Sequence, residues 1–296
     1  MLLPLLASAL LLQDPPKPPP LPGAKEAPAA QAPEKPLVPG ALPEGTGAEE
    51  RTLWQQLCRA ALGKDGSRVP LTGFDLLLDA EIRPADNQRN EVRALRYRYQ
   101  APDWVRATTE KGRELLHGPK GDFLIDPTTN EKQMLAVGRE GAEDRRQLLE
   151  IADLSRNFIA LSDPAALRIA ELKLGSASPA LPPEAQKLVW LELLTPDFRL
   201  PGAATPGMLR VRLGLRRDKG LPELCLVGPG EPGARPTTLI RVLDYREKQG
   251  LVVPHDLALF PLDKATGKFA VQPGLRIWLK HDSNLRPQFA PETFVP

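Results

Sequence analysis

Residues 101–127 read APDWVRATTEKGRELLHGPKGDFLIDP and hold three short runs of strand-forming residues. Pro102 and the sequence GPKG at 118–121 mark turns around these runs, and the Asp-Pro pair at 126–127 ends the third. Glycine and proline in such places favour tight turns, and tight turns join antiparallel neighbours. We therefore expect a meander, in which each strand pairs with the next along the chain.

The same kind of pattern continues on both sides of this stretch. Residues 74–82 alternate apolar with mostly charged side chains, and Leu95, Tyr97 and Tyr99 alternate with arginines. Such alternation is typical of half-buried strands. Further strands are predicted at 104–109, 113–117, 122–125, 132–137, 188–194, 209–216, 223–227, 238–245, 252–260 and 268–280.

Apolar residues at helical spacing occur at 49–62 and again at 143–161, which predicts two amphipathic helices. A third, short helix is predicted from Ser162 and Asp163, either of which can cap it, to about residue 172, with Pro164 in its first turn. The order helix, sheet, helices, sheet indicates an α+β fold.

We expect one strongly curved, unclosed antiparallel half-barrel of about 11–12 strands, with helices covering its concave face. An apolar face must be covered, and helices that cover it only partly leave an apolar cleft. No domain boundary is indicated between residues 48 and 296, because the proline- and glycine-rich stretches there have only the length of loops. Residues 48–296 are thus expected to form a single domain.

Two segments with a different composition precede this domain. Residues 1–12 are almost wholly apolar, but a helix of that length spans about 18 Å, too little for the ~30 Å core of a membrane. Residues 1–13 therefore fit a signal peptide and an exported, periplasmic protein, although no Lys or Arg precedes the apolar run, so a plain apolar terminus stays open. Residues 14–47 are rich in proline and alanine and predict a disordered tether; a proline-rich recognition sequence is the alternative.

The composition argues against several function classes. A net charge of +2 and the lack of a basic block indicate no nucleic-acid partner. The three histidines lack metal-ligand spacing, so we predict neither a metal nor another cofactor. The nucleophile-elbow, phosphate-loop, dinucleotide-binding and zinc-protease motifs are all missing, which predicts that the chain is not an enzyme. Cys58 and Cys225 could form a disulfide or stay separate buried thiols.

Several of these residues carry a resemblance to a known family. The matching segments are PDWVR at 102–106, GDF at 121–123, DP at 126–127 and the tail 284–296. With them the chain resembles the periplasmic outer-membrane lipoprotein-carrier family, half-barrels of the LolA, LolB and RseB type. The proline- and glycine-rich stretch 175–233 departs from the family pattern.

The resemblance implies an apolar cavity that shelters an acyl chain and performs no chemistry. Each buried methylene contributes about 0.8 kcal/mol, so an acyl chain needs a large apolar lining. The candidate lining residues are the apolar positions of the predicted strands and lid helix, namely Phe74, Leu76, Leu78, Leu95, Tyr97, Tyr99, Leu148, Phe158, Leu209, Val211 and Leu213. Arg106 is expected to link the lid to the sheet, as the matching arginine does in the family. Ordinary core packing and a solvated arginine are the alternatives.

Three function hypotheses follow. The first is a monomeric carrier that binds the acyl chain of a lipid or lipoprotein. The second is a sensor or interaction module on the same fold, whose partner is an envelope membrane protein. The third is an enzyme of unrecognised type. An open cleft would favour the first hypothesis, and a cavity filled by large side chains would favour the second.

Overall fold

The computed structural model of the protein describes residues 36–63, 71–82, 91–101, 104–108, 114–118, 120–126, 128–129, 131–134, 153, 156–179, 181–200, 207–263 and 266–295. The predicted signal peptide, the predicted tether up to residue 35 and Leu148 lie outside these residues. The rest of the predicted tether contacts the domain, because the backbone N–H of Gly40 donates to the carbonyl of Leu167 at 3.0 Å.

The described elements begin with one helix and continue with strands and three 3-10 turns. In chain order they are α1 (Ala48–Ala60), β1 (Gly73–Ile82), β2 (Glu91–Gln100), β3 (Trp104–Thr108), β4 (Glu114–Gly118), β5 (Gly121–Ile125), β6 (Lys132–Met134), η1 (Pro164–Ala166), β7 (Glu171–Leu174), η2 (Pro183–Lys187), β8 (Val189–Thr195), β9 (Leu209–Leu215), β10 (Pro222–Pro229), β11 (Thr238–Lys248), β12 (Leu251–Asp263), β13 (Lys268–Phe269), β14 (Leu275–Leu279) and η3 (Pro291–Phe294). Residues 156–162 are helical as well.

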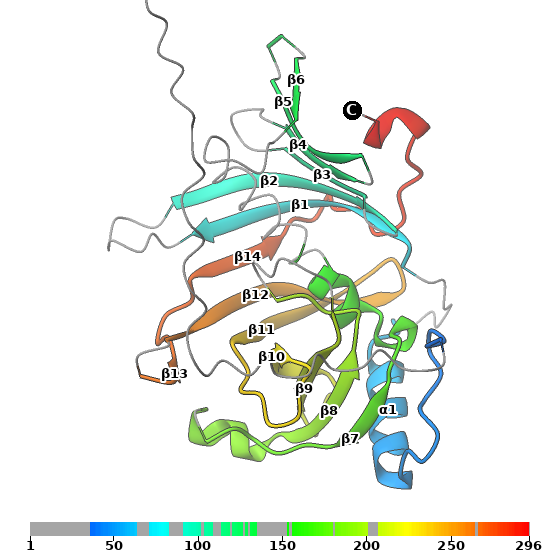
Figure 1. Cartoon of the computed structure of the whole chain (residues 1–296), viewed down its shortest axis with the longest axis vertical. Helices are drawn as coiled ribbons and strands as arrows, with labels where there is room; N and C mark the ends of the chain where they lie inside the picture. Colours follow the sequence, from blue (N-terminus) through cyan, green and yellow to red (C-terminus); the bar gives the residue numbers. More distant parts are fainter. Residues whose placement is uncertain are drawn as a thin grey trace, which may run out of the picture. The chain divides into compact units, whose positions relative to one another are not determined.

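All strands belong to one antiparallel sheet, which is curved and spans the view in Figure 1. Its order is β6-β5-β4-β3-β2-β1-β14-β12-β11-β10-β9-β8-β7, with β13 paired to β12. Consecutive strands pair on each side, and β14 joins the two sides by lying between β1 and β12. Within the described residues the end strands β6 and β7 have one neighbour each, so the sheet is not closed. The predicted unclosed half-barrel is confirmed.

The sheet has 14 strands, more than the predicted number, because short strands escaped the sequence pattern. The prediction of a helix over residues 162–172 is wrong. Pro164 begins a 3-10 turn of three residues without a side-chain cap, since the carboxylate of Asp163 accepts the backbone N–H of Leu71 instead. The chain is then extended and ends in β7, which pairs with β8. The predicted strand 268–280 is likewise split into β13 and β14.

One face of the sheet, here called the inner face, carries the main core. In β1 it is marked by the buried side chains of Phe74, Leu76 and Leu78. Residues directly opposite each other on antiparallel strands project to the same side, so the partners of these residues on β2 share this face. Apolar residues of α1 and of the helical residues 156–162 join the same buried cluster, so the helices cover the inner face as expected.

The opposite, outer face is covered in two places by chain segments without long helices. The C-terminal cover, residues 287–295, places Phe289 and Phe294 over β3–β5. The internal cover, residues 177–179 and 181–188, places Leu181 and Ala185 over β8–β11. Figure 1 shows the C-terminal segment in red beside β3 and β4, and η2 in green beside β8. Each cover buries its own small apolar cluster.

Cys58 and Cys225 are not joined by a disulfide in the structure, so the disulfide alternative is not realised. Cys225 is fully buried on β10, and Cys58 is half-buried on α1. Burial raises the pKa of the Cys225 thiol above its ordinary value. A thiol of this kind stays protonated and unreactive at neutral pH.

Candidate functional site

The predicted lining residues that the structure describes lie together on the inner face. Those buried in the main core are Phe74, Leu76, Leu78, Tyr97, Tyr99, Phe158, Leu209, Val211 and Leu213, each at most 8% exposed. Leu95 is half-buried and packs against the same core. Leu148 lies outside the described residues.

The strand register explains why these residues meet. Phe74, Leu76 and Leu78 of β1 stand opposite Tyr99, Tyr97 and Leu95 of β2, respectively. In the other half of the sheet, Leu213 and Val211 of β9 stand opposite Leu191 and Leu193 of β8. All of these side chains belong to one apolar cluster. The inner face is therefore continuous from one half of the sheet to the other.

Aromatic rings mark the place where the helix at 156–162 meets the sheet. The ring of Phe74 stacks on that of Tyr99 with centroids 5.3 Å apart, and it meets the ring of Phe158 edge-on at 5.6 Å. Such pairs contribute about 0.5–1.5 kcal/mol beyond the burial of their area. Phe158 therefore positions the helix over β1 and β2.

A polar contact also fastens this helix, and sequence analysis missed it. The side-chain amide of Asn157 donates to the carbonyl of Arg199 at 3.0 Å, and its oxygen accepts the backbone N–H of the same residue at 2.8 Å. Asn157 is only 1% exposed. The pair links the helix to the loop that follows β8. The only signal in the sequence is a polar residue beside Phe158 on the apolar stripe of the helix.

Charged groups gather near Tyr99, around the same helix and loop. Arg168 pairs with Asp197 through Nε and Nη2, at 2.9 and 2.5 Å from the same carboxylate oxygen. Burial lowers the pKa of Arg156 and that of Arg199. The positive charges of Arg199 and Arg168 lower the pKa of Arg156 further. Burial raises the pKa of Tyr99, against the influence of both arginines. The apolar inner face is thus bordered by partly desolvated charges of both signs, because Asp153 and Asp197 also act on Arg199.

Arg106 lies on the outer face, and its described contacts differ from the expected contact with the lid. Val105 and Ala107 occupy the inner face, so the side chain of Arg106 between them projects outward. It pairs with Glu114, with Nε at 3.1 Å from the carboxylate, and its Nη1 donates to the carbonyl of Thr293 at 2.8 Å. Arg106 therefore ties the C-terminal cover, rather than a lid, to the sheet.

Two other kinds of site were searched for in the part of the chain that the structure describes. There, no three His, Cys, Asp or Glu side chains converge as metal ligands. None of its helices combines the length and the apolar composition that a membrane span requires.

No protein-family model matches the sequence, and no curated protein matches it. Solved structures with a similar architecture include a LolA superfamily protein, NE2245, from Nitrosomonas europaea, with 11% identity, 81% of this chain and 94% of that chain covered, and a TM-score of 0.44. Another is a DUF1329 family protein from Desulfovibrio piger, with 10% identity, 82% and 96% coverage, and a TM-score of 0.46. A third is an outer membrane lipoprotein-sorting protein domain from Vibrio parahaemolyticus, with 11% identity, 82% and 95% coverage, and a TM-score of 0.43. Likenesses at this level carry no argument about ligand or partner.

Proposed function

We propose that this chain is a non-catalytic, exported carrier that binds the acyl chain of a lipid or lipoprotein between the inner face and the helix at 156–162. The observation that carries the proposal is the continuous apolar inner face. Each methylene placed against it is hidden from water and contributes about 0.8 kcal/mol. Signal-peptide cleavage near residue 13, a tether and a monomeric state are parts of the same proposal.

Binding would require the helix at 156–162 to shift or the inner face to repack. The candidate lining side chains in the main core are at most 8% exposed, so they contact one another when no acyl chain is bound. Among the described residues of this helix, the side chain of Asn157 is hydrogen-bonded to the backbone of Arg199. Opening would have to break this pair of hydrogen bonds.

A second candidate function is a sensor or interaction module that binds an envelope membrane protein and no lipid. It is favoured by the way the large side chains of Phe74, Tyr97, Tyr99 and Phe158 fill the inner face themselves. In this case the inner face is an ordinary core, and recognition uses other surfaces.

Overpacking the inner face separates the two candidates. Ala107 lies on the inner face between Leu115 and Tyr97, and Ala258 lies on the outer face between Arg241 and Arg276. Both alanines are 1% exposed. Ala107→Leu and Ala258→Leu therefore add the same volume to opposite faces, and each is expected to lower the free energy of unfolding by about 1–3 kcal/mol.

The measurement is a titration of the full chain with a fatty acid that carries a fluorescent group. The carrier proposal expects saturable binding, weakened about tenfold by Ala107→Leu, which corresponds to about 1.4 kcal/mol. Ala258→Leu should leave the Kd unchanged. Two results would show that the inner face is not the acyl site. One is the lack of saturable binding to the unmodified protein, and the other is equal weakening of binding by both substitutions. The interaction module would then be the better interpretation.

A further inference from the structure

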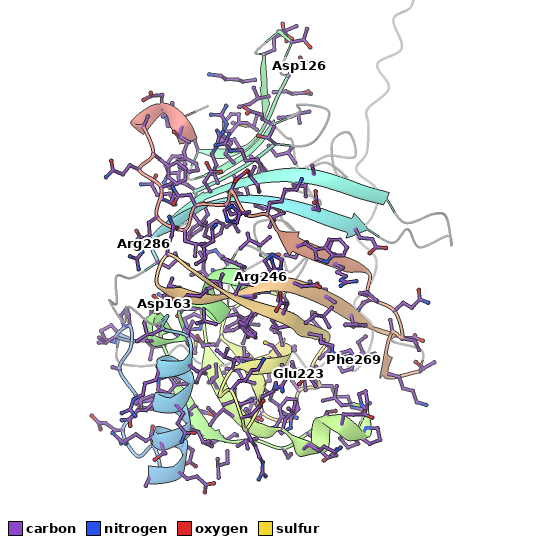
Figure 2. The ribbon with its side chains drawn as sticks, turned by 180° about the vertical axis from the view of Figure 1, so that it is seen from behind. Asp126, Asp163, Glu223, Arg246, Phe269 and Arg286 are labelled. Atoms are coloured by element: carbon purple, nitrogen blue, oxygen red, sulfur yellow. The ribbon has the colours of Figure 1, made fainter. Side chains whose placement is uncertain are left out.

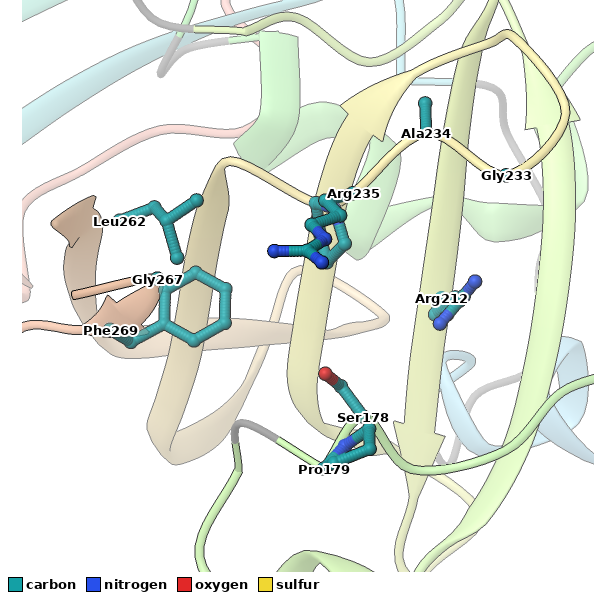
Figure 3. A pocket seen from close by; sticks show the side chains of 10 residues that line it. Ser178, Pro179, Arg212, Gly233, Ala234, Arg235, Leu262, Gly267 and Phe269 are labelled. Carbon is teal, nitrogen blue, oxygen red and sulfur yellow. The ribbon is translucent and has the colours of Figure 1, made fainter. Parts of the chain in front are cut away.

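A pocket of about 340 Å³ opens on the outer face of the sheet, away from the inner core. Its volume falls within the range of about 300–1,000 Å³ that is usual for small-molecule sites. Figure 3 shows Arg212, Arg235, Ser178 and Phe269 around it. No part of the proposed function uses this pocket.

Four separate parts of the chain build the pocket. Arg212 belongs to β9, and Arg235 to the loop between β10 and β11. Ser178 comes from the internal cover, and Phe269 from β13. Arg212 stands opposite Leu226, a residue of the outer cluster, and its neighbours in β9 are in the inner core. The pocket therefore lies on the face opposite to the proposed acyl site.

The charge of the pocket is unbalanced. Of the ten described residues that line it, two are arginines and none is acidic. Arg212 donates through Nε to Glu192 at 2.7 Å, but this carboxylate also accepts from Arg210 at 2.8 Å and lies 3.1 Å from the ammonium of Lys173. One carboxylate thus serves three cations, and Glu171 adds a second carboxylate only at the Arg210 side, at 3.3 Å.

Arg235 adds a further positive charge. It is exposed, and within the described part of the chain it makes no ion pair. Glu231, in the same loop as Arg235, and Asp263, at the end of β12, are not among the lining residues. Asp263 accepts the hydroxyl of Thr266 at 2.8 Å. The guanidinium of Arg235 is therefore available to an anion in the pocket.

The remaining lining is mostly apolar. The ring of Phe269 and the side chain of Leu262 form one side, and Pro179 and Pro236 contribute further apolar surface. A planar guanidinium binds carboxylate or phosphate oxygens in pairs, and an aromatic ring favours a flat apolar group. Groups that can make both kinds of contact line this one pocket.

We propose that this pocket binds a small molecule in which a carboxylate or phosphate is attached to an aromatic or compact apolar body. Arg235 contacts the anion, Arg212 adds to the positive field, and Phe269 contacts the apolar body. The inference is independent of the proposed acyl site, because it rests on the opposite face of the sheet.

The test is calorimetric titration of the full chain with phenyl phosphate, benzoate and inorganic phosphate at low salt. We expect saturable, equimolar binding of phenyl phosphate or benzoate, with inorganic phosphate binding more weakly. Arg235→Gln should weaken binding about tenfold, because a charged hydrogen-bond donor is lost. Arg217→Gln, which removes an exposed arginine of the β9–β10 turn, is the matched control and should have no effect. Phe269→Ala should abolish the preference for phenyl phosphate over inorganic phosphate.

Three results would overturn the proposal. The first is the absence of saturable binding to the unmodified protein. The second is binding that Arg235→Gln and Arg217→Gln weaken equally, since it would reflect net charge alone. The third, from a parallel titration with vesicles that contain phosphatidylglycerol, is binding to these vesicles with no binding of phenyl phosphate, benzoate or inorganic phosphate. That result would indicate a charged membrane-facing surface instead of a pocket for a small molecule.

Discussion

The C-terminal cover and the internal cover both shield part of the outer face from water, but they are held to the sheet with different strength. Both bury an apolar part of the outer face, and beneath each cover a tryptophan ring lies against a glycine of the next strand. Beneath the C-terminal cover a Cβ on Gly118 would meet the ring of Trp104 at 2.7 Å, and beneath the internal cover a Cβ on Gly214 would meet the ring of Trp190 at 2.9 Å. The two arrangements thus have the same local geometry.

The difference lies in how each tryptophan and each segment is held. Trp190 is 4% exposed, and its indole N–H donates to the carbonyl of Ala185 at 3.0 Å. Trp104 is half-buried and contacts Phe294 with ring centroids 6.2 Å apart. The internal cover is connected to a strand at both ends, β7 and β8. The C-terminal cover is held to the sheet by Phe289 and Phe294 and by the hydrogen bond from Arg106 to the carbonyl of Thr293. Contacts of this kind can open locally without unfolding of the sheet.

The largest expected effect comes from Trp190→Ala. It removes a buried ring together with its hydrogen bond, and should lower the free energy of unfolding by about 3–5 kcal/mol. Trp104→Ala should have a clearly smaller effect, because that ring is half-buried. Denaturant unfolding followed by circular dichroism measures both. Equal losses would show that the two covers are equally integrated.

Glu192→Gln tests the charge network beside the internal cover. Burial opposes ionisation of Glu192, but hydrogen bonds from Arg210 and Lys173 outweigh it and lower the pKa below its ordinary value of 4.5. The stabilisation is therefore complete above that value and is lost as the pH falls through the lower pKa of the folded state. We expect the substitution to lower stability by about 2 kcal/mol at pH 7.

The pH dependence is the control for this prediction. The difference in unfolding free energy between Glu192→Gln and the unmodified protein should shrink as the pH is lowered below 4.5. A difference that stays constant from pH 7 to pH 3 would show that the effect is steric and not electrostatic.

Glycine substitutions compare the two tryptophans with smaller changes. Gly214→Ala places a methyl group against a ring that is fixed by its hydrogen bond, and should lower stability by about 1–2 kcal/mol. Gly118→Ala places one against the half-buried ring of Trp104, for which no side-chain hydrogen bond is described, and should lower stability less. Thermal unfolding of the two variants gives the comparison directly. If Gly118→Ala proved the more destabilising, Trp104 would be the more rigid of the two rings.

The smallest global effect is expected for Phe294→Ala. Phe294 is 4% exposed and packs on Phe289 at 5.0 Å, but its loss is limited by the free energy with which the C-terminal cover docks. We expect a loss of about 1 kcal/mol or less in global unfolding. Hydrogen exchange should accelerate in residues 287–295 and on β4, and should be unchanged on β8 and β9. Faster exchange on β8 would contradict the independence of the two covers.

The sequence predicted the inner face better than the outer one. Alternation of Phe74, Leu76 and Leu78 specifies which side of β1 is buried, and the structure places them there. Local patterns also predicted the consecutive strand pairs. They could not predict that β14 pairs with β1, because about 200 residues separate these strands and nothing local specifies so distant a partner.

The contacts that sequence analysis missed join residues that are distant in sequence, and no local pattern specifies such contacts. Arg106 fits a solvated strand position until the C-terminal segment brings the carbonyl of Thr293 to it. Asn157 is unremarkable until the loop after β8 presents the backbone of Arg199. The same holds for the pocket at Arg235, whose lining comes from four parts of the chain.

Native mass spectrometry would test the acyl-carrier proposal most directly. The protein would be purified without detergent from the cells that produce it, and its intact mass recorded with and without added phospholipid. We predict one acyl-bearing molecule per chain, lost in Ala107→Leu and retained in Ala258→Leu. An unliganded mass in the unmodified protein, unchanged by added phospholipid or lipopeptide, would contradict the proposal that the inner face carries an acyl chain.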